Sequence, residues 1–126
     1  MGALADSKPC IVICTTDRAR SADFYRAKLG LTQILDDIFA ATFDVGGVSL
    51  RVSAVPGFAS HNHTIAGFHV SDVEATVREL ARNGVTFNFY EQFTQDALGI
   101  WTAPGDAFKV AWFQDPDGNV LSVTNA

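Results

Sequence analysis

One pattern occurs twice along the chain, and this repetition limits the possible folds more than any other feature. In each copy an apolar run leads into an acidic residue, an amphipathic stretch and a glycine. These features fall at 10–15, Asp17, 18–28 and Gly30 in the first copy, and at 65–70, Asp72, 73–83 and Gly84 in the second. Such self-similarity is typical of a chain built from two copies of one supersecondary unit. The order strand, helix, strands in each copy predicts an α+β fold.

Local signals for the two helices agree with this order. Ser71 and Glu74 have the spacing of a capping box at the start of the second helix, and Gly84 suits the left-handed position after its end. Between them, apolar residues over 73–81 recur at helical spacing, so this helix has one apolar face. The first helix, expected over 18–28, shows the same recurrence and ends at a glycine.

After each helix, runs of strand-forming residues predict further strands. We expect strands over 32–35, 39–45 and 48–53 in the first copy, and over 86–93, 99–103, 108–114 and 120–124 in the second. Gly46-Gly47 is a hairpin signal, and Asp115-Pro116-Asp117-Gly118-Asn119 has the composition of a tight turn. Such short connections favour antiparallel pairing. We expect one domain over 1–126, with a first module at about 8–55, a linker at about 56–62 and a second module at about 63–126.

Composition excludes several kinds of partner. The 126 residues include nine Lys and Arg against fourteen Asp and Glu, a formal charge of −5 at pH 7. A protein that binds nucleic acid needs a basic face to neutralise phosphates, so we expect no nucleic-acid partner. No apolar run approaches the roughly 20 residues that cross a bilayer, and residues 1–9 lack the features of a secretion signal. We therefore expect a cytoplasmic protein without a membrane partner.

The two cysteines, Cys10 and Cys14, are separated by three β-branched residues that favour a strand. Four residues of strand span roughly 13 Å, which is beyond the roughly 7 Å between Cα atoms that a disulfide tolerates. We therefore expect two free thiols on the same face of a strand, as is usual in a reducing compartment.

Two segments carry a resemblance to a known family. The first runs from Asp17 through Phe24-Tyr25 to Leu29-Gly30-Leu31, and the second is Phe113-Gln114-Asp115-Pro116-Asp117-Gly118-Asn119. Together with the repeat, they make the chain resemble the vicinal oxygen chelate superfamily, which groups glyoxalase I, bleomycin-resistance proteins, fosfomycin-resistance enzymes and extradiol dioxygenases. The resemblance implies two βαβββ modules that form a half-open barrel with a central cavity. It also implies a homodimer in which modules of two chains complete the cavities.

Metal-dependent members of that superfamily hold a divalent ion with carboxylates and imidazoles at corresponding places in the two modules. The resemblance places those ligand positions at Cys10, Arg51, Ile65 and Ser122. None of the four residues is His, Asp or Glu. Arginine is always cationic, and isoleucine has no lone pair to donate. The sequence therefore predicts no metal at this location and no other cofactor.

Seven residues are candidates for a ligand site: Cys10, Cys14, Arg51, Ile65, His69, Trp101 and Ser122. Strand alternation puts Arg51 on one face with Ser49 and Ser53. There its guanidinium suits a ligand's carboxylate, phenolate or phosphate; the alternatives are an internal salt bridge and a position at the rim of the cavity. Trp101 is the best candidate for a ring that stacks on a planar ligand.

Several other side chains have two interpretations. Cys10 is either a buried structural residue or a thiol activated by Arg51. His69 is either a structural residue of its strand or an acid–base group. The linker pair His61 and His63 has a loose metal-like spacing but lacks a third ligand, so we expect it to be solvated.

These candidates favour a binding protein over an enzyme, and no catalytic residue is assigned. The leading hypothesis is a metal-independent protein of the bleomycin-resistance type that sequesters a small aromatic or amphipathic molecule, such as an antibiotic. One alternative is a metal-dependent lyase, isomerase or extradiol dioxygenase relative with a displaced metal site. The other is a metal-free enzyme that uses Arg51 with Cys10 or His69.

Overall fold

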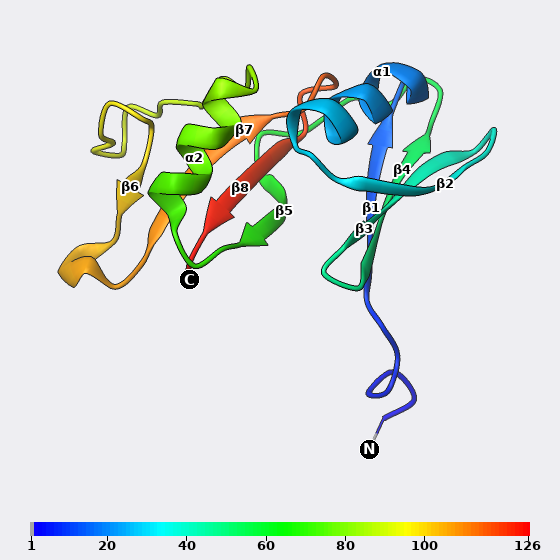
Figure 1. Cartoon of the computed structure of the whole chain (residues 1–126), viewed down its shortest axis with the longest axis horizontal. Helices are drawn as coiled ribbons and strands as arrows, with labels where there is room; N and C mark the ends of the chain where they lie inside the picture. Colours follow the sequence, from blue (N-terminus) through cyan, green and yellow to red (C-terminus); the bar gives the residue numbers. More distant parts are fainter. Residues whose placement is uncertain (1) are drawn as a thin grey trace.

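Two four-stranded sheets with the same strand order make up the protein, as seen in a computed structural model that describes residues 2–126 (Figure 1). In the first sheet the order is β1 (Cys10–Thr15), β4 (Val48–Ala54), β3 (Ala40–Val45) and β2 (Thr32–Asp36). In the second sheet it is β5 (Thr64–His69), β8 (Val120–Thr124), β7 (Lys109–Gln114) and β6 (Trp101–Thr102). The first and last strands of each module pair in parallel, and the other pairs are antiparallel.

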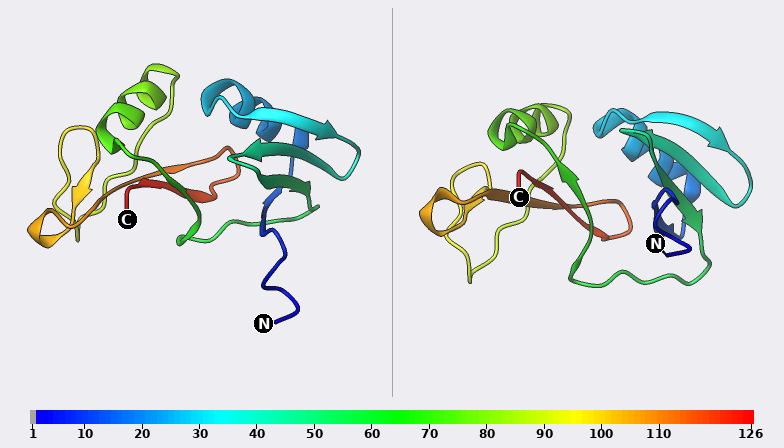
Figure 2. Two further views of the ribbon diagram at one scale, coloured as in Figure 1. Left: turned by 60° about the horizontal axis from the view of Figure 1, so that its bottom comes forward. Right: turned by 90° about the horizontal axis from the view of Figure 1, so that it is seen from below.

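The sheets lie side by side, and within residues 2–126 they form no closed barrel (Figure 1). One helix of each module covers one face of its sheet. In the first module the helix α1 (Arg18–Asp23) continues into a π-helical turn, η1 (Phe24–Lys28). In the second module α2 (Val73–Arg82) has the same place. A 3-10 turn, η2 (Pro104–Asp106), precedes β7. Both helices lie on the same side of the molecule (Figure 2). This arrangement confirms the predicted α+β fold of two βαβββ modules in a half-open arrangement.

The helix starts and the tight turns have local causes. Asp17 and Asp72 cap the two helices, because each carboxylate accepts the backbone N–H three residues later, at 3.1 and 3.0 Å. The expected capping box at Ser71 is therefore wrong by one residue. Gly84 follows α2 at a φ of +96°, as expected, and Gly46-Gly47 form the β3–β4 turn at +58° and +86°. No helix within residues 2–126 has the length and apolar character to cross a membrane.

The expected continuous helix over 18–28 is correct in position but changes type at Phe24. The N–H of Leu29 donates to the Phe24 carbonyl oxygen five residues back, at 3.2 Å, which makes this turn a π-helix. Within it Tyr25 is fully buried against Phe43, with ring centroids 6.0 Å apart. Phe24 reaches Phe113 of the second module at 6.5 Å. This turn therefore supplies aromatic contacts both within the first module and between the modules.

The stretch between α2 and β7 departs most from the prediction. The strands expected over 86–93 and 99–103 reduce to isolated bridges and the two residues of β6. Residues 90–100 leave the sheet, because several of their backbone groups bond to the side chains of Gln95 and Asp96. Side chains that satisfy nearby backbone groups in this way compete with strand pairing.

The turn between β7 and β8, Asp115–Asn119, joins the two modules. Its Asp117 carboxylate accepts hydrogen bonds from four residues at the start of the first module's helix: Thr15, Thr16, Arg20 and Ser21. Asp115 accepts the Tyr25 hydroxyl at 2.7 Å, and the Asn119 side chain donates to the Cys14 carbonyl oxygen at 2.9 Å. The side chain of Asp117 is only 3% exposed. We call this set of contacts the module joint.

The pKa values of two groups in the module joint, Asp117 and Tyr25, differ from their ordinary values. Burial opposes the charge on Asp117, but the hydrogen bonds from Thr15, Thr16 and Ser21 outweigh it and hold the pKa of this carboxyl below its usual range. Because its pKa is lower in the folded state, Asp117 adds stability that is present above the ordinary aspartate pKa of roughly 4 and is lost as the pH falls below it. Burial, and then the charge of Asp115, raise the pKa of Tyr25 far above its ordinary value, so its hydroxyl remains a donor.

We predict that Asp117→Asn lowers the free energy of unfolding at pH 7 by about 2–3 kcal/mol, since charge-assisted hydrogen bonds are lost and an amide then faces donors. Urea denaturation followed by circular dichroism, at pH 7 and at about pH 3, measures the effect. The variant should lose less stability between the two pH values than the unaltered protein. Asp6→Asn, which alters an exposed carboxylate in the N-terminal segment, is the matched control. Equal stability of Asp117→Asn and the unaltered protein at pH 7 would contradict this account of the joint.

Candidate functional site

Each sheet has one face that carries no helix, which we call its open face. In β1 and β4 the side chains of Ile13, Leu50 and Val52 are fully buried on the helix side, and the residues between them are partly or fully exposed. Successive side chains of a strand point to opposite faces, so these intervening residues lie on the open face. On the first sheet they are Cys10, Val12, Cys14, Ser49, Arg51 and Ser53. The predicted alternation around Arg51 is therefore correct.

The second sheet follows the same rule. Ala111, Phe113 and Leu121 are buried on the helix side, so Trp112 and Ser122, which pair across β7 and β8, lie on the open face. Three further groups on this open face follow from the strand registers: Trp101 opposite Val110, Gly67 opposite Ser122, and His69 opposite Thr124. Ile65, two residues before Gly67, is 38% exposed.

The strand registers show that Arg51 and Ser122 occupy equivalent positions in the two modules. Arg51 pairs with Val12, two residues after Cys10. Ser122 pairs with Gly67, which in the same way is two residues after Ile65. Arg51 and Ser122 therefore correspond between the modules. Cys10 and Ile65 do not correspond in pairing, because Cys10 pairs with Ser49 whereas Ile65 lies in a register shift of β5 and has no partner in β8.

The side chains at these positions do not suit a divalent metal ion. A thiol, a guanidinium, a branched hydrocarbon and a hydroxyl together provide at most one good anionic donor, and the guanidinium repels a cation. Across residues 2–126, no three His, Cys, Asp or Glu side chains are grouped in a way that would hold a metal ion. These four side chains therefore do not support a metal-dependent reaction at this location.

Arg51 places a cation on the first open face. It is partly buried, and within residues 2–126 its guanidinium makes no ion pair and no hydrogen bond to a side chain. The charge of Arg51 affects the titration of Asp37. The backbone N–H groups of Phe39 and Ala40, and then the charges of Arg51 and Arg18, hold the pKa of Asp37 below its usual range. The salt bridge considered as an alternative role for Arg51 is therefore not formed within the described chain.

Five aromatic side chains gather on and beside the second open face: Tyr90, Phe93, Trp101, Phe108 and Trp112. We call them the aromatic cluster. Phe93 stacks on Trp112 with ring centroids 5.1 Å apart and planes inclined by 14°, and Tyr90 meets Trp112 edge-on at 5.5 Å. Trp101 contacts Phe93 at 5.2 Å and Phe108 at 5.8 Å. These rings form a continuous aromatic surface at the side of the sheet away from α2.

Gln95 holds the segment 90–100, which brings two of the five rings to the cluster. Its Oε1 accepts the N–H of Tyr90 at 2.7 Å, and its Nε2 donates to the carbonyl oxygens of Asn88 and Gly99, both at 2.8 Å. A single side chain thus closes both ends of the segment. The position of the aromatic cluster depends on these three hydrogen bonds.

Two cavities border the aromatic cluster. The first, of about 220 Å³, is lined by Tyr90, Phe93 and Trp112 together with linker residues that include His63. The second, of about 480 Å³, has Trp101 in its wall with mostly polar neighbours, among them Thr102 and Gln92. Both combine large rings with hydrogen-bonding groups, as small-molecule sites commonly do.

The structure separates the seven predicted residues into three groups. Cys10, Cys14 and Arg51 lie on the first open face; His69, Ser122 and Trp101 lie on the second; and Ile65 lies in the register shift at the start of β5. Neither cavity beside the aromatic cluster is lined by a residue of the first open face. Within one chain, then, these two cavities do not bring the cation and the indole together.

The sequence matches the family model of the Glyoxalase/Bleomycin resistance protein/Dioxygenase superfamily over residues 9–123. The chain belongs to this superfamily. The match covers both modules and agrees with the resemblance seen in the motifs. A comparison with curated protein sequences finds no match.

Solved structures of this superfamily share the fold. A putative glyoxalase family protein from Bacillus anthracis has a TM-score of 0.74 at 14% identity, over 98% of each chain. The glyoxalase family protein from Enterococcus faecalis also has 0.74, at 16% identity, over 96% of this chain and 98% of the other. Lactoylglutathione lyase from Agrobacterium tumefaciens has 0.65 at 16% identity, over 94% and 92%. At these identities the likeness concerns the fold alone.

Sequence reasoning did not place Tyr90, Phe93 or Trp112 in the site. Trp112 carried a usable signal, because it lies between two residues that face the helix, and alternation puts it on the open face. Tyr90 and Phe93 carried none, since the sequence predicted a strand where the structure has the segment held by Gln95.

We predict that Gln95→Ala loosens the aromatic cluster, since three backbone groups lose their partner. The expected loss in free energy of unfolding is about 1–3 kcal/mol. The tryptophan emission should shift to longer wavelength, because Trp101 and Trp112 become more exposed to water. Fluorescence and urea denaturation measure both effects, and Glu91→Ala, at an exposed position of the same segment that lines neither cavity, is the control. Unchanged emission in Gln95→Ala would mean that the cluster does not depend on this side chain.

Proposed function

We propose that this chain is a metal-independent binding protein that holds a small aromatic or amphipathic molecule, an antibiotic being one such molecule, against the open faces of its sheets. The observation that carries the proposal is the aromatic cluster on the second open face. The proposal places the protein with the bleomycin-resistance type of its superfamily rather than with the metal-dependent lyases, isomerases and dioxygenases.

The chemistry of the aromatic cluster supports a planar ligand. Trp101 and Trp112 are partly exposed, so their rings are accessible beside the two cavities. An aromatic pair adds about 0.5–1.5 kcal/mol beyond the burial of its surface. Several rings on one surface can therefore retain a planar guest, while the hydroxyl and amide groups around Trp101 orient its polar atoms.

Arg51 supports a ligand that carries an anionic or phenolic group. Its guanidinium makes no ion pair within the described residues, and a planar donor of this kind binds a carboxylate through two parallel hydrogen bonds. The hydroxyls of Ser49 and Ser53 lie on the same face, on either side of Arg51 along the strand. These groups would fix the orientation of the guest.

We further infer a homodimer, because the cation and the aromatic cluster lie on different sheets. A pair in which the first open face of one chain covers the second open face of its partner would unite them in one cavity. Exposed apolar side chains at the β2–β3 hairpin support such a contact: Ile38 is 79% and Phe39 is 66% exposed, with Ile34 and Leu35 beside them. Clustered exposed apolar groups commonly mark an interaction surface.

We predict that planar aromatic carboxylates raise the melting temperature and bind in isothermal titration with EDTA present. Trp101→Ala should abolish binding. Arg51→Gln should weaken aromatic carboxylates by about 10- to 100-fold, the usual value of a charged hydrogen bond, and leave neutral planar ligands nearly unaffected. Arg78→Gln, which removes an exposed arginine of α2 on the other side of the sheet, is the matched control.

Two outcomes would count against this function. One is a screen of planar ligands in which none changes the melting temperature. The other is stoichiometric Zn, Ni, Mn or Fe in protein purified without added metal, together with turnover of hemithioacetals or catechols. Loss of a metal-free turnover in a Cys10→Ala variant that still binds ligand would instead favour an enzyme that uses Arg51 with Cys10.

We predict that the protein sediments as a dimer and that Ile38→Asp converts it to a monomer with an unchanged circular dichroism spectrum, because a charge there cannot be buried without a partner. Analytical ultracentrifugation measures the change. Leu4→Asp, which alters an exposed leucine of the N-terminal segment, should leave the dimer intact. A monomeric variant that keeps full affinity for the ligand would show that one chain suffices for the site.

A further inference from the structure

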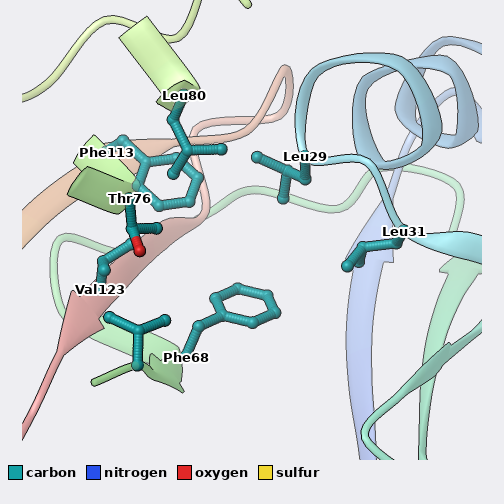
Figure 3. Close-up of a pocket in the computed structure, with 8 residues that line it drawn as sticks. Leu29, Leu31, Phe68, Thr76, Leu80, Phe113 and Val123 are labelled. Carbon is teal, nitrogen blue, oxygen red and sulfur yellow. The ribbon is translucent and has the colours of Figure 1, made fainter. Parts of the chain in front are cut away.

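A smaller cavity lies between the two modules on the helix side of the sheets, away from the open faces (Figure 3). Its volume is about 150 Å³. Leu29 and Leu31 form the wall contributed by the first module, directly after η1. The opposite wall comes from α2 and three strands of the second module: Leu80, Phe113, Phe68 and Val123. We call this space the intermodule cavity.

The lining of the intermodule cavity is almost entirely hydrocarbon. Thr76, on α2, is the polar side chain in its wall, and the Thr76 hydroxyl already donates to the Asp72 carbonyl oxygen at 2.9 Å. An ordered water needs two or more polar partners, and this lining offers one hydroxyl, so water in the space is easily displaced by an apolar guest. A charged guest would lose its hydration without compensation. The cavity therefore selects apolar guests.

The cavity also has a floor and a mouth. Leu80, Phe113 and Val123 are buried and form the floor. Leu31 and Phe68 are only partly buried and lie toward solvent, on facing modules. Figure 3 shows these two side chains on opposite sides of the space, with the rest of the lining around it. A guest can thus enter from solvent between the modules without unfolding either sheet.

We propose that the intermodule cavity is a binding site for a benzene-sized apolar molecule. The size fits, since an apolar cavity of about 150 Å³ lined by Leu, Ile and Phe is known to hold benzene or xenon. Leucine and phenylalanine side chains surround the guest in the same manner here. This site is distinct from the proposed ligand site on the open faces, and neither depends on the other.

A guest in this cavity has a consequence for the whole fold. It touches the first module through Leu29 and Leu31 and the second through Phe113 and Leu80, so it binds only when the modules are docked. Phe113 also contacts Phe24 across the same boundary, at 6.5 Å. A ligand that binds only the docked state stabilises it by RT ln(1 + [L]/Kd), so the melting temperature rises with ligand concentration. The site therefore reports on the docking of the modules.

The experiment uses the full chain and toluene as the probe, with benzoate as a charged probe of similar size. In Trp101→Ala, which removes the proposed site for planar guests on the open face, we expect saturable binding of toluene at one site per chain by isothermal titration, a higher melting temperature, and no saturable binding of benzoate. Thr76→Leu enlarges a side chain of the α2 wall, so that it occupies part of the cavity, and introduces a better helix former; it should remove toluene binding while the protein stays folded. Ala75→Leu adds the same side chain at the neighbouring exposed position of α2 and should keep toluene binding.

Variants of the open faces separate the two sites. Trp101→Ala and Arg51→Gln should retain toluene binding at the intermodule cavity, whatever their effect on ligands of the open faces. Absence of saturable toluene binding by the unaltered protein would overturn the proposal. Toluene binding that survives in Thr76→Leu, or that disappears in Trp101→Ala, would also overturn it, since the guest would then lie elsewhere. If Thr76→Leu fails to fold, Leu31→Trp, at a partly exposed position of the opposite wall, provides the same test.

Discussion

Asp117, in the turn between β7 and β8, lies against the start of the first module's helix, where hydroxyl, amide and guanidinium groups all donate to it. The adjacent Asp115 and Asn119 extend these contacts to the Tyr25 hydroxyl and to the backbone of β1. Each sheet has its own hydrogen-bonded strands, so these polar contacts mainly set how the sheets sit relative to each other. The relative positions of the two open faces, and the width of the intermodule cavity, therefore depend on this joint.

The two sides of each sheet differ in how tightly their side chains are packed. On the helix side, side chains such as Leu50, Val52 and Leu121 are buried and hold each module together. On the open side, packing is less uniform, because Arg51 is partly exposed whereas Ser122 is buried at 6% exposure. A substitution at position 51 is therefore less constrained by packing than one at position 122.

The repeat in the sequence was enough to predict the two modules, their helices and most strands, because each signal lies within one short stretch. The face of Arg51 was also predictable, since burial alternates cleanly along β4. The aromatic cluster was not, because residues 90–100 are positioned by Gln95, whose three partners lie up to seven residues away and have no periodic signature. The distances between the two sheets could not be predicted from the sequence either, since they depend on the long-range contacts of the module joint.

The order of the strands along the chain has a further consequence for biosynthesis. The first sheet is complete once residue 54 has been made, because β1 pairs with β4. Three hydroxyls of this module have their carboxylate acceptors almost at the end of the chain. Tyr25 donates to Asp115, and Thr15 and Ser21 donate to Asp117. N-terminal units commonly fold first during translation. Until the last turn has been made, water is the partner of these hydroxyls. Docking of the last turn exchanges that water for the carboxylates of Asp115 and Asp117.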